Sequence, residues 1–341
     1  MKVGLLTGGG DCPGLNAVIR AVVRCAAARG SQVIGILEGW RGLVEGNTRP
    51  IEPDEVRGLI RQGGTILRTS RTNPFRAPEV LERLLATWKS LNLDALVAIG
   101  GEDTLGVAAR LHREHGWPVV GVPKTIDNDI RATDYTFGFD TAVSIATEAI
   151  DRLHTTAESH NRIMVVEVMG RHAGWIAIHA GIAGGASYIA IPERPVTVEQ
   201  ICGAVRARAM SGLNYSIIVV AEGAQIAGLR NRRISAADEF GHTLLGGIGH
   251  ELAGQIAEET GFETRVTVLG HVQRGGRPTA YDRVLSTRYG VLACDLVHRE
   301  QFGTMVSLTG NEVVPVDLSE AVAEPKTVGP DLIALSEIFF S

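Results

Sequence analysis

The segment Ile99–Gly106, IGGEDTLG, combines residue types that could do chemistry on phosphate. Gly100 and Gly101 follow the apolar run LDALVAI, which is how a parallel strand typically delivers its backbone to an anion. The next two residues, Glu102 and Asp103, are both acidic. Carboxylates are a poor lining for a phosphate loop, although their oxygens are good ligands for a hard cation. The two acids therefore need roles other than phosphate binding.

A second glycine-rich turn lies in LLTGGGDCPGLNAVIR, and it includes Gly9 and Gly10. Bare backbone N–H groups followed by a helix N-terminus form an anion site. The spacing matches neither the Walker A loop nor the G-x-G-x-x-G of dinucleotide-binding folds. One such loop is as consistent with a structural tight turn as with a binding loop. Two of them, at two strand ends on one sheet edge, favour a binding crevice.

The segment Pro123–Ile130, PKTIDNDI, places Lys124, Asp127 and Asp129 just after another apolar strand. Two aspartates at this spacing often only cap a helix or solvate a loop. Beside a lysine and at a strand end, they favour one carboxylate that takes a proton from an alcohol. The remaining carboxylates would then hold a metal ion.

Short β-branched and leucine-rich runs alternate with longer helical patterns along the chain. KVGLLTGGG precedes a predicted helix over 15–28, and LDALVAIGG precedes one over about 104–114. Further helices are predicted over about 139–159, 198–210, 244–259 and 280–299. This alternation predicts an α/β fold of two three-layer domains with mostly parallel sheets. Because no low-complexity linker separates the halves, we expect the domains to pack closely, with the active site in a cleft between them. The polar segment 228–241 is expected to be an exposed insertion.

Composition narrows the class of protein. The 341 residues suffice for about two domains, and a net charge of −5 argues against a nucleic-acid-binding protein. No apolar run reaches the roughly 18 residues of a membrane helix, and MKVGLLTGGG predicts a first strand rather than a signal peptide. The four cysteines lie far apart, which favours reduced thiols in a cytoplasm over disulfides or a zinc site. Cys12 is either a reactive thiol or a small residue in a tight turn.

Five segments together resemble the 6-phosphofructokinase family, and its pyrophosphate-dependent members most. They are GGGDCPGLNAVIR, GGEDTLG, PKTIDNDI, VVEVMGRHAGW and TVLGHVQRGGRPTAYDR, which occur in the family's order between Gly8 and Arg283. The resemblance implies Mg²⁺-assisted phosphoryl transfer to the 1-hydroxyl of fructose 6-phosphate. It also implies a donor domain over 1–137 and about 276–325. A fructose 6-phosphate domain would cover 138–275 and about 326–341.

The same resemblance assigns roles to individual residues. Asp127 is the expected general base, with Lys124 and Arg171 stabilising the transferring charge, and Glu102 and Asp129 are the expected metal ligands. Pyrophosphate contacts are expected from Gly9, Gly10 and Arg71, with Arg68 as an alternative to Arg71. Fructose 6-phosphate contacts are expected from Thr125, Asp127, Arg162, Met169, Gly170, Arg171, Glu222, Arg265, His271 and Arg274.

The resemblance further implies an oligomer. Arg162 and Arg265 match arginines that family members supply from a neighbouring subunit, so a homo-oligomer with shared active sites, a dimer or a tetramer, is expected. At two positions of the effector site of nucleotide-controlled relatives, this chain has His154 and Ser187 rather than Arg and Glu. These differences favour loss of that control.

Asp103 and Lys124 bear on the phosphoryl donor. The ATP-using members that this chain resembles have Gly at the position of Asp103, where the nucleotide's α-phosphate approaches the backbone. Two like charges a few ångströms apart in a partly shielded site cost on the order of several kcal/mol, and pyrophosphate escapes this clash. Lys124 is typical of pyrophosphate-type members, although some ATP-dependent relatives share it. Asp103 is also suited to cap a helix that begins at Thr104.

Three other functions remain open from the sequence. An ATP-dependent phosphofructokinase would share the fold and differ in the donor. A non-catalytic sugar-phosphate or nucleotide sensor would be expected to lose Asp127 or the metal carboxylates, which this chain keeps. A Rossmann-type dehydrogenase would want a G-x-G-x-x-G loop, which is missing here.

Overall fold

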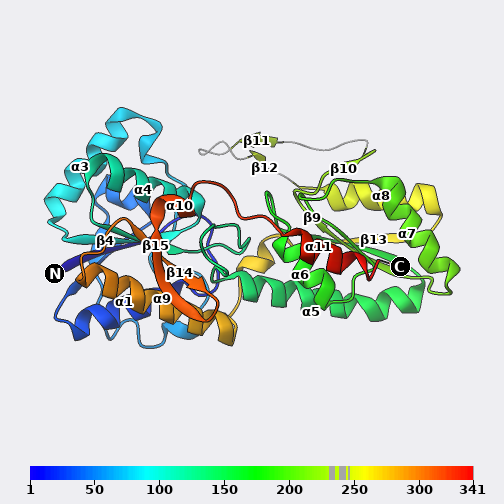
Figure 1. The fold of residues 1–341 in the computed structure, drawn as a ribbon, viewed down its shortest axis with the longest axis horizontal. Coiled ribbons are helices and arrows are strands. Elements are labelled where there is room, and N and C mark those ends of the chain that lie inside the picture. The colour runs from blue at the N-terminus through cyan, green and yellow to red at the C-terminus, as the bar shows by residue number, and fades with distance from the viewer. Residues whose placement is uncertain (230–234, 238–242, 245, 341) are drawn as a thin grey trace. The chain divides into compact units, whose positions relative to one another are not determined.

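The computed structural model describes residues 1–229, 235–237, 243–244 and 246–340. The chain forms two compact units (Figure 1). The first consists of Met1–Thr141 with Arg274–Pro325, and the second of the described part of 142–273 with 326–340. The segment 228–241, the expected exposed insertion, lies mostly outside the described residues. No helix in the described ranges is both long and apolar enough to cross a bilayer.

The first unit is built on a seven-stranded sheet with the strand order β15-β14-β5-β4-β1-β2-β3. Its strands are β1 (Lys2–Thr7), β2 (Gln32–Ile36), β3 (Thr48–Pro50), β4 (Ala95–Gly100), β5 (Val119–Pro123), β14 (Thr304–Thr309) and β15 (Glu312–Asp317). The interior pairs are parallel, and only β15 and β3 at the two edges run antiparallel to their neighbours. β4 is buried along its whole length, as expected of a strand covered on both faces.

Helices cover both faces of this sheet. They are α1 (Leu15–Ala28), α2 (Trp40–Glu45), α3 (Pro78–Leu91), α4 (Glu102–His115), α9 (Ala280–His298) and α10 (Leu318–Ala321), with the 3₁₀-helices η1 (Leu59–Arg61) and η2 (Pro74–Arg76). Figure 1 shows α1 and α9 below the sheet and α3 and α4 above it. α1 is amphipathic, so its apolar face is buried while Arg24 and Ala28 remain exposed.

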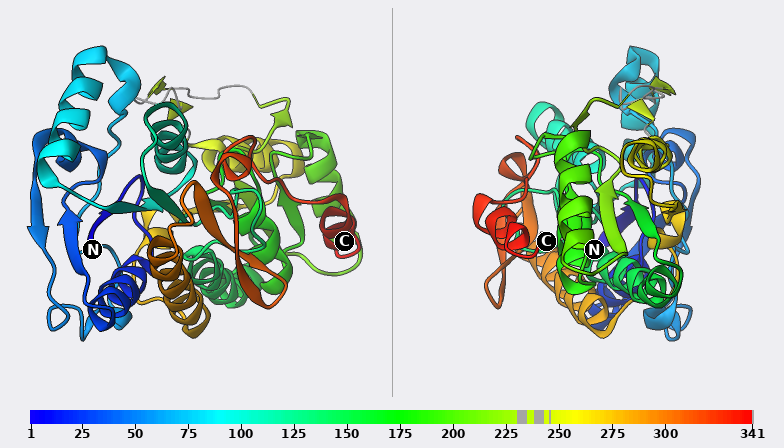
Figure 2. Two further views of the ribbon diagram at one scale, coloured as in Figure 1. Left: turned by 60° about the vertical axis from the view of Figure 1, so that its left-hand side comes forward. Right: turned by 90° about the vertical axis from the view of Figure 1, so that its right-hand side faces the viewer.

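The second unit has a four-stranded, all-parallel sheet with the order β13-β6-β9-β7. Its strands are β6 (Ile163–Val168), β7 (Tyr188–Ala190), β9 (Ser216–Ala221) and β13 (Thr264–Val268). The helices are α5 (Phe139–His160), whose first residues belong to the first unit, α6 (Trp175–Ala183), α7 (Val198–Met210), α8 (Ile248–Thr260) and α11 (Pro330–Glu337), with the 3₁₀-helix η3 (Gly270–Arg274) at the end of this unit. Short pairs β8 (Val196–Thr197) with β10 (Ile226–Ala227), and β11 (Ser235–Ala237) with β12 (Thr243–Leu244), complete the described strands. Figure 2 shows this unit from two further sides, with helices beside its strands.

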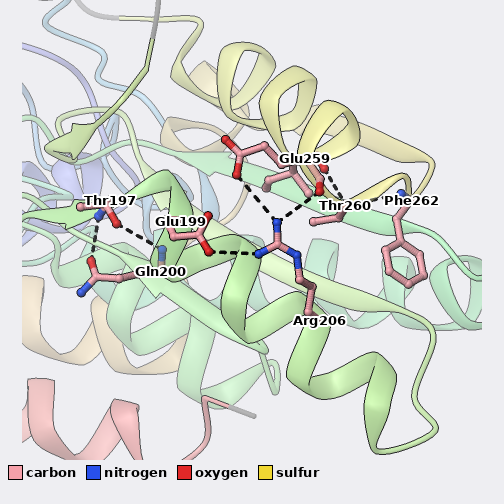
Figure 3. Close-up of polar contacts among 8 residues, drawn as sticks. Thr197, Glu199, Gln200, Arg206, Glu259, Thr260 and Phe262 are labelled. Carbon is pink, nitrogen blue, oxygen red and sulfur yellow. Dashed lines mark hydrogen bonds and ion pairs between the residues drawn. The ribbon is translucent and has the colours of Figure 1, made fainter.

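Local signals explain how α7 begins and how it is held to α8. The Thr197 hydroxyl accepts a hydrogen bond from Gln200 N, and the Gln200 side chain accepts one from Thr197 N, which forms a capping box. Farther along α7, the Arg206 guanidinium contacts Glu199 and donates to the carbonyl of Glu259 at the end of α8 (Figure 3). Ile201 and Val205, on the buried face of α7, belong to the apolar core of this unit.

The α/β fold with mostly parallel sheets is confirmed, and α1 covers 15–28 as predicted. The prediction that the next helix begins at Thr104 with Asp103 as its cap is wrong. α4 begins at Glu102, and Gly101, in an extended conformation, occupies the N-cap position. Because glycine is also an acceptable N-cap residue, the tight turn and the helix start coincide here. α8 begins at Ile248 rather than near Leu244, after Gly247 in a left-handed conformation.

Buried Asp282 ties the start of α5 to the start of α9. One oxygen accepts from Gly138 N at 3.0 Å, and the other accepts from Thr141 N at 2.8 Å and from the Thr141 hydroxyl at 2.5 Å. Thr279 caps α9 by accepting from Asp282 N. Burial raises the pKa of Asp282 to about 6, although these donors oppose the shift.

This raised pKa predicts a pH-dependent stability. Between pH about 4 and about 6 the native carboxyl binds a proton that the unfolded chain has released, so the free energy of unfolding falls as pH rises. Asp282→Asn lacks this titration. We expect the unfolding free energy of the variant to gain on the wild type by roughly 2–3 kcal/mol between pH 4 and 7 in urea titrations. A constant difference between the two proteins across this range would contradict the assignment.

Candidate functional site

Three neighbouring parallel strands of the first unit end at one edge of the sheet. β1 lies beside β4 with Thr7 opposite Ile99, and β4 lies beside β5 with Gly100 opposite Pro123. The strands are followed by the glycine loop that starts at Gly8, by Gly101 and the first turn of α4, and by Lys124. The register therefore brings together the three segments that the sequence marked out separately.

The glycine loop is shaped by side chains that occupy the space of its missing Cβ atoms. A Cβ on Gly8 would lie 2.5 Å from the Thr104 hydroxyl oxygen, and one on Gly10 would lie 2.5 Å from Arg274 Nη1. Gly9 has a φ of +76°, which disfavours any other residue. Gly8 N donates to the carbonyl of Ile99 at 2.9 Å, and Gly9 N to that of Ser70 at 3.2 Å. The loop thus requires glycine for both conformation and close approach.

Lys124 lies under this loop as a buried cation. Its side chain is 3% exposed, and its Nζ donates to the carbonyl oxygen of Gly10 at 2.5 Å. Burial lowers the pKa of Lys124, and the nearby Arg274 guanidinium lowers it further, while Cys12, Asp127 and Asp129 act in the opposite direction. Lys124 and Arg274 together place positive charge against the loop.

Cys12 in the same loop is a packing residue. Its thiol is fully buried, donates to the carbonyl of Phe137 at 3.6 Å, and has its pKa raised by burial to about 12. A thiol with so high a pKa carries almost no thiolate, so of the two expectations for Cys12 the small buried residue is the one the structure supports.

The carboxylates at this edge could hold a divalent cation. Burial raises the pKa of Asp129, the negative charge of Glu102 raises it further, and a hydrogen bond with the Thr125 side chain opposes both effects. Two carboxylates whose charges oppose each other are relieved by a shared cation. No group of three or more metal-ligating side chains exists among the described residues. Two carboxylates nevertheless suit Mg²⁺, which usually keeps waters and takes further oxygens from substrate phosphates.

Asp127 is positioned by a tight turn after β5. Asp127 N donates to the Thr125 hydroxyl at 3.1 Å, and Asn128 follows with a φ of +51°. The Asn128 side chain is buried and accepts from Thr136 N at 3.0 Å, while Thr136 donates to the carbonyl of Thr125. The turn that carries Asp127 is therefore held by hydrogen bonds on both sides.

The second unit repeats this layout with β13, β6 and β9. Val168 at the end of β6 pairs with Ala221 of β9, and Glu222 N then donates to the carbonyl of Val168 at 2.9 Å. Met169, Gly170 and Arg171 follow β6 on the same edge. Gly223 N donates to Gly170 O at 3.0 Å, and the buried Arg171 Nε donates no hydrogen bond to any described residue. A guanidinium in this state is suited to bind an oxyanion.

His271 lies in η3, just beyond β13 and the Leu269 N–H that donates to Glu167 O. The η3 residue Gln273 is fully buried, and its Oε1 accepts from Met169 N at 3.4 Å. Sequence reasoning did not identify Gln273 as a supporting residue. The only feature of the sequence that could have indicated this role is the position of Gln273 within the motif GHVQRGG.

Arg162 and Arg265 lie elsewhere in the second unit. Arg162 precedes β6, and Arg265 is the second residue of β13, opposite Met164. Both guanidiniums contact the carboxylate of Glu263. They therefore form a pair near the amino ends of β6 and β13. The carboxyl ends of β6, β9 and β13 lead to Met169, Glu222 and His271, respectively. Six residues of strand span roughly 20 Å, so this pair is separated from that cluster within one unit.

Three other candidate arginines have distinct surroundings. Arg274 belongs to the first unit, where its Nη1 donates to the carbonyl of Asp11 at 3.3 Å beside the glycine loop. Arg68 lies 3.8 Å from Glu38 with a φ of +57°, and Arg71 is exposed. Both arginines remain candidates for a contact with the donor phosphates.

His154 and Ser187, which differ from the effector site of nucleotide-controlled relatives, make hydrogen bonds within the second unit. His154 Nε2 lies 2.7 Å from the carbonyl oxygen of Gly184, and the Ser187 hydroxyl accepts from Ile217 N at 3.3 Å. Ser187 is buried and carries no charge.

Comparisons with known proteins place the chain in a family. Residues 2–297 match the model of the phosphofructokinase family. A pyrophosphate–fructose 6-phosphate 1-phosphotransferase of Amycolatopsis methanolica is 59% identical over the whole of both chains. An ATP-dependent 6-phosphofructokinase of Streptomyces coelicolor is 51% identical over 97% of each. The phosphofructokinase of Pichia pastoris has a TM-score of 0.84 and 34% identity, covering 99% of this chain and 36% of that one.

The chain belongs to the phosphofructokinase family, which confirms the resemblance read from its motifs. It is a phosphotransferase by that membership.

Glu193 is a supporting residue that the sequence did not reveal. Gly174 N donates to both of its carboxylate oxygens at 3.0 Å, and Val328 N donates to Oε1 at 3.0 Å. Gly174 follows Arg171 by three residues and is the N-cap of α6. One carboxylate therefore fastens the C-terminal segment to the turn that carries Arg171.

We expect Glu193→Ala to lower the free energy of unfolding by about 2–4 kcal/mol, because two partly buried N–H groups lose a charged acceptor. Urea unfolding measures this loss. Glu199→Gln is the control, since it removes an exposed ion pair with Arg206 and one charge in the first turn of α7, and should cost about 1 kcal/mol or less. Equal losses in the two variants would show that Glu193 does not fasten these segments.

Proposed function

We propose that this chain transfers a phosphoryl group from pyrophosphate to the 1-hydroxyl of fructose 6-phosphate, giving fructose 1,6-bisphosphate and phosphate in a reversible reaction of the cytoplasm. The observation that carries the choice of donor is the position of Asp103. Its carboxylate lies in the first turn of α4, next to the strand ends that carry the glycine loop and Lys124. Anions bind at helix N-termini, and this one already holds two carboxylates, which would repel the α-phosphate of a nucleotide.

The first unit is proposed to bind the donor. Backbone N–H groups of Gly9 and Gly10, the Arg71 guanidinium and the buried Lys124 ammonium would contact pyrophosphate. Glu102 and Asp129 would hold Mg²⁺, which neutralises charge on the donor phosphates when bound. Lys124 uses one of its three N–H donors for the carbonyl of Gly10, and the other two would serve phosphate oxygens.

The reacting hydroxyl requires a base and a cation. Asp127 is proposed to accept the proton of the attacking 1-hydroxyl, since the turn after β5 holds its backbone in place. Arg171 and Lys124 would stabilise the charge that moves between the phosphates. The sugar phosphate would be held by Thr125, Met169, Gly170, Glu222, His271 and Arg274 as well as by Arg171.

We propose a homo-oligomer, a dimer or a tetramer, whose active sites are shared between subunits. The support is the location of Arg162 and Arg265 near the amino ends of β6 and β13, far from the other sugar contacts of the same unit. Their shared partner Glu263 is half-exposed, so the pair remains available to an anion from outside the unit.

An ATP-dependent phosphofructokinase is the second candidate, because relatives at 51% identity carry that name. A donor comparison decides between the two. The protein is assayed with Mg²⁺ and fructose 6-phosphate, with either pyrophosphate or ATP. Higher kcat/KM with ATP would reject the pyrophosphate proposal, and loss of activity with chelator would support the metal.

Replacing Asp103 tests the reason for the donor preference. In Asp103→Gly the first turn of α4 loses one negative charge and its side-chain bulk, so ATP should become usable. We expect kcat/KM for ATP to rise at least about tenfold, equivalent to about 1.4 kcal/mol. Asp103→Asn is the matched control that removes charge and keeps bulk. If neither variant improves ATP use, Asp103 does not select the donor.

A subunit-mixing experiment tests the base and the sharing of sites together. Asp127→Ser should lose most of kcat, by about 100-fold or more, with little change in fructose 6-phosphate binding. Arg162→Ala should mainly weaken that binding. If sites are shared, co-expressing the two variants forms some sites with both wild-type residues and restores activity. Arg162→Ala mixed with Arg265→Ala is the control, because both residues come from the same subunit. Recovery in the control alone, or full activity of Asp127→Ser, would contradict the proposal.

A further inference from the structure

Helices α1 and α9 of the first unit lie side by side, as Figures 1 and 2 both show. A Cβ built on Gly290 of α9 would lie 2.7 Å from the Cβ of Ala21 and 2.8 Å from the carbonyl oxygen of Val18, both in α1. The two helices therefore touch backbone to backbone at Gly290. Such a close approach brings the side chains of the next turn within reach of each other.

One turn beyond this contact, each helix carries a cysteine. Cys25 follows Ala21 by four residues, and Cys294 follows Gly290 by four residues, so both point along the same shared face. The helices run in the same direction, because contacts farther along α9 reach later residues of the first segment. Asp295 contacts Arg29, and His298 Nε2 lies 2.9 Å from the Ser31 hydroxyl.

Hydrogen bonds hold the two thiols in this place. Cys25 Sγ donates to Asp295 Oδ1 at 3.8 Å, and Cys294 Sγ lies 3.6 Å from His298 Nδ1. Burial raises the pKa of Cys294, and the neighbouring Cys25 thiol raises it further. Cys25 is partly exposed, whereas Cys294 is 2% exposed, and both are free thiols.

We propose that Cys25 and Cys294 are a modification site, in which a hydroperoxide converts the two thiols into an intramolecular disulfide. This property is independent of the donor and sugar sites and does not rest on the proposed function.

The chemistry takes two steps and balances with one peroxide. The Cys25 thiolate, on the accessible side, attacks the peroxide oxygen, which gives a sulfenic acid and, with hydrogen peroxide, releases hydroxide. The Cys294 thiol then attacks the Cys25 sulfur and forms the S–S bond, while its proton passes to the departing hydroxyl group, which leaves as water. In sum, two thiols lose two hydrogen atoms, and hydrogen peroxide is reduced to two waters.

The disulfide would cross-link α1 to α9. It joins residues far apart in the sequence, so it removes many conformations from the unfolded chain and stabilises the native one. Cys25 lies ten residues beyond the start of α1, or roughly 15 Å along the helix axis, from the end that carries the glycine loop. The disulfide therefore constrains the C-terminal end of α1 and leaves the glycine loop at its N-terminal end unchanged.

The test treats the full-length protein with hydrogen peroxide in slight excess and quenches it with an alkylating agent. Intact mass should show loss of two hydrogen atoms per chain and two alkylated thiols instead of four under denaturing conditions. Peptide mapping should link the peptides that contain Cys25 and Cys294, and dithiothreitol should reverse the change. The melting temperature of the oxidised protein should rise by several degrees.

Cys25→Ser and Cys294→Ser should each abolish the bridge, while Cys202→Ser, which alters a buried thiol of the second unit, should keep it. Sulfinic acid at Cys25 without a bridge would overturn the proposal. So would a bridge between two chains, a bridge through another cysteine, or a bridged protein that melts no higher than the reduced one.

Discussion

The bond from the Lys124 ammonium to the carbonyl of Gly10 is the contact on which the first unit's site depends. An ammonium that is 3% exposed needs an acceptor, and the loop carbonyl supplies one at 2.5 Å. This contact forms only because β5 lies beside β4 and β4 beside β1 in a fixed register. Beside this contact, Arg274 fills the space that a Cβ on Gly10 would need, and Gly9 is required by its φ of +76°.

The second unit also gathers its candidate residues at the carboxyl ends of parallel strands, in a separate sheet. β13, β6 and β9 are parallel neighbours, and their carboxyl ends bring together His271, Arg171 and Glu222. A parallel sheet gathers loops at one edge, and residues at the opposite edge are excluded from that cluster. The separation of Arg162 and Arg265 from the rest of the proposed sugar contacts is therefore a consequence of topology.

The sequence predicted the features that depend on residues close together in the chain. The strand ends, the glycine turns and the 15–28 helix follow from local spacing, and the family motifs supplied the candidate residues. Contacts between distant segments had no such signal. Glu193 and Val328 are 135 residues apart, and nothing near Glu193 indicates that it holds the turn after Arg171. The start of α4 was misjudged because Gly101 serves both as turn and as helix cap, which a search for Asp or Ser caps overlooks.

That misjudged helix start changes the physical account of donor choice. As an N-cap residue, Asp103 would present its carboxylate to the free N–H groups of the first turn. In the first turn, Asp103 and Glu102 both lie in the positive field of the N-terminus of α4, where carboxylates are stabilised by about 0.3–1 kcal/mol each. An α-phosphate would seek the same field. The two acids therefore stabilise the helix, and under the proposed function the same interaction would oppose the binding of a nucleotide. A cation on Glu102 and Asp129 would offset this repulsion for a small, metal-bound donor, while Asp103 would keep its charge toward anything larger.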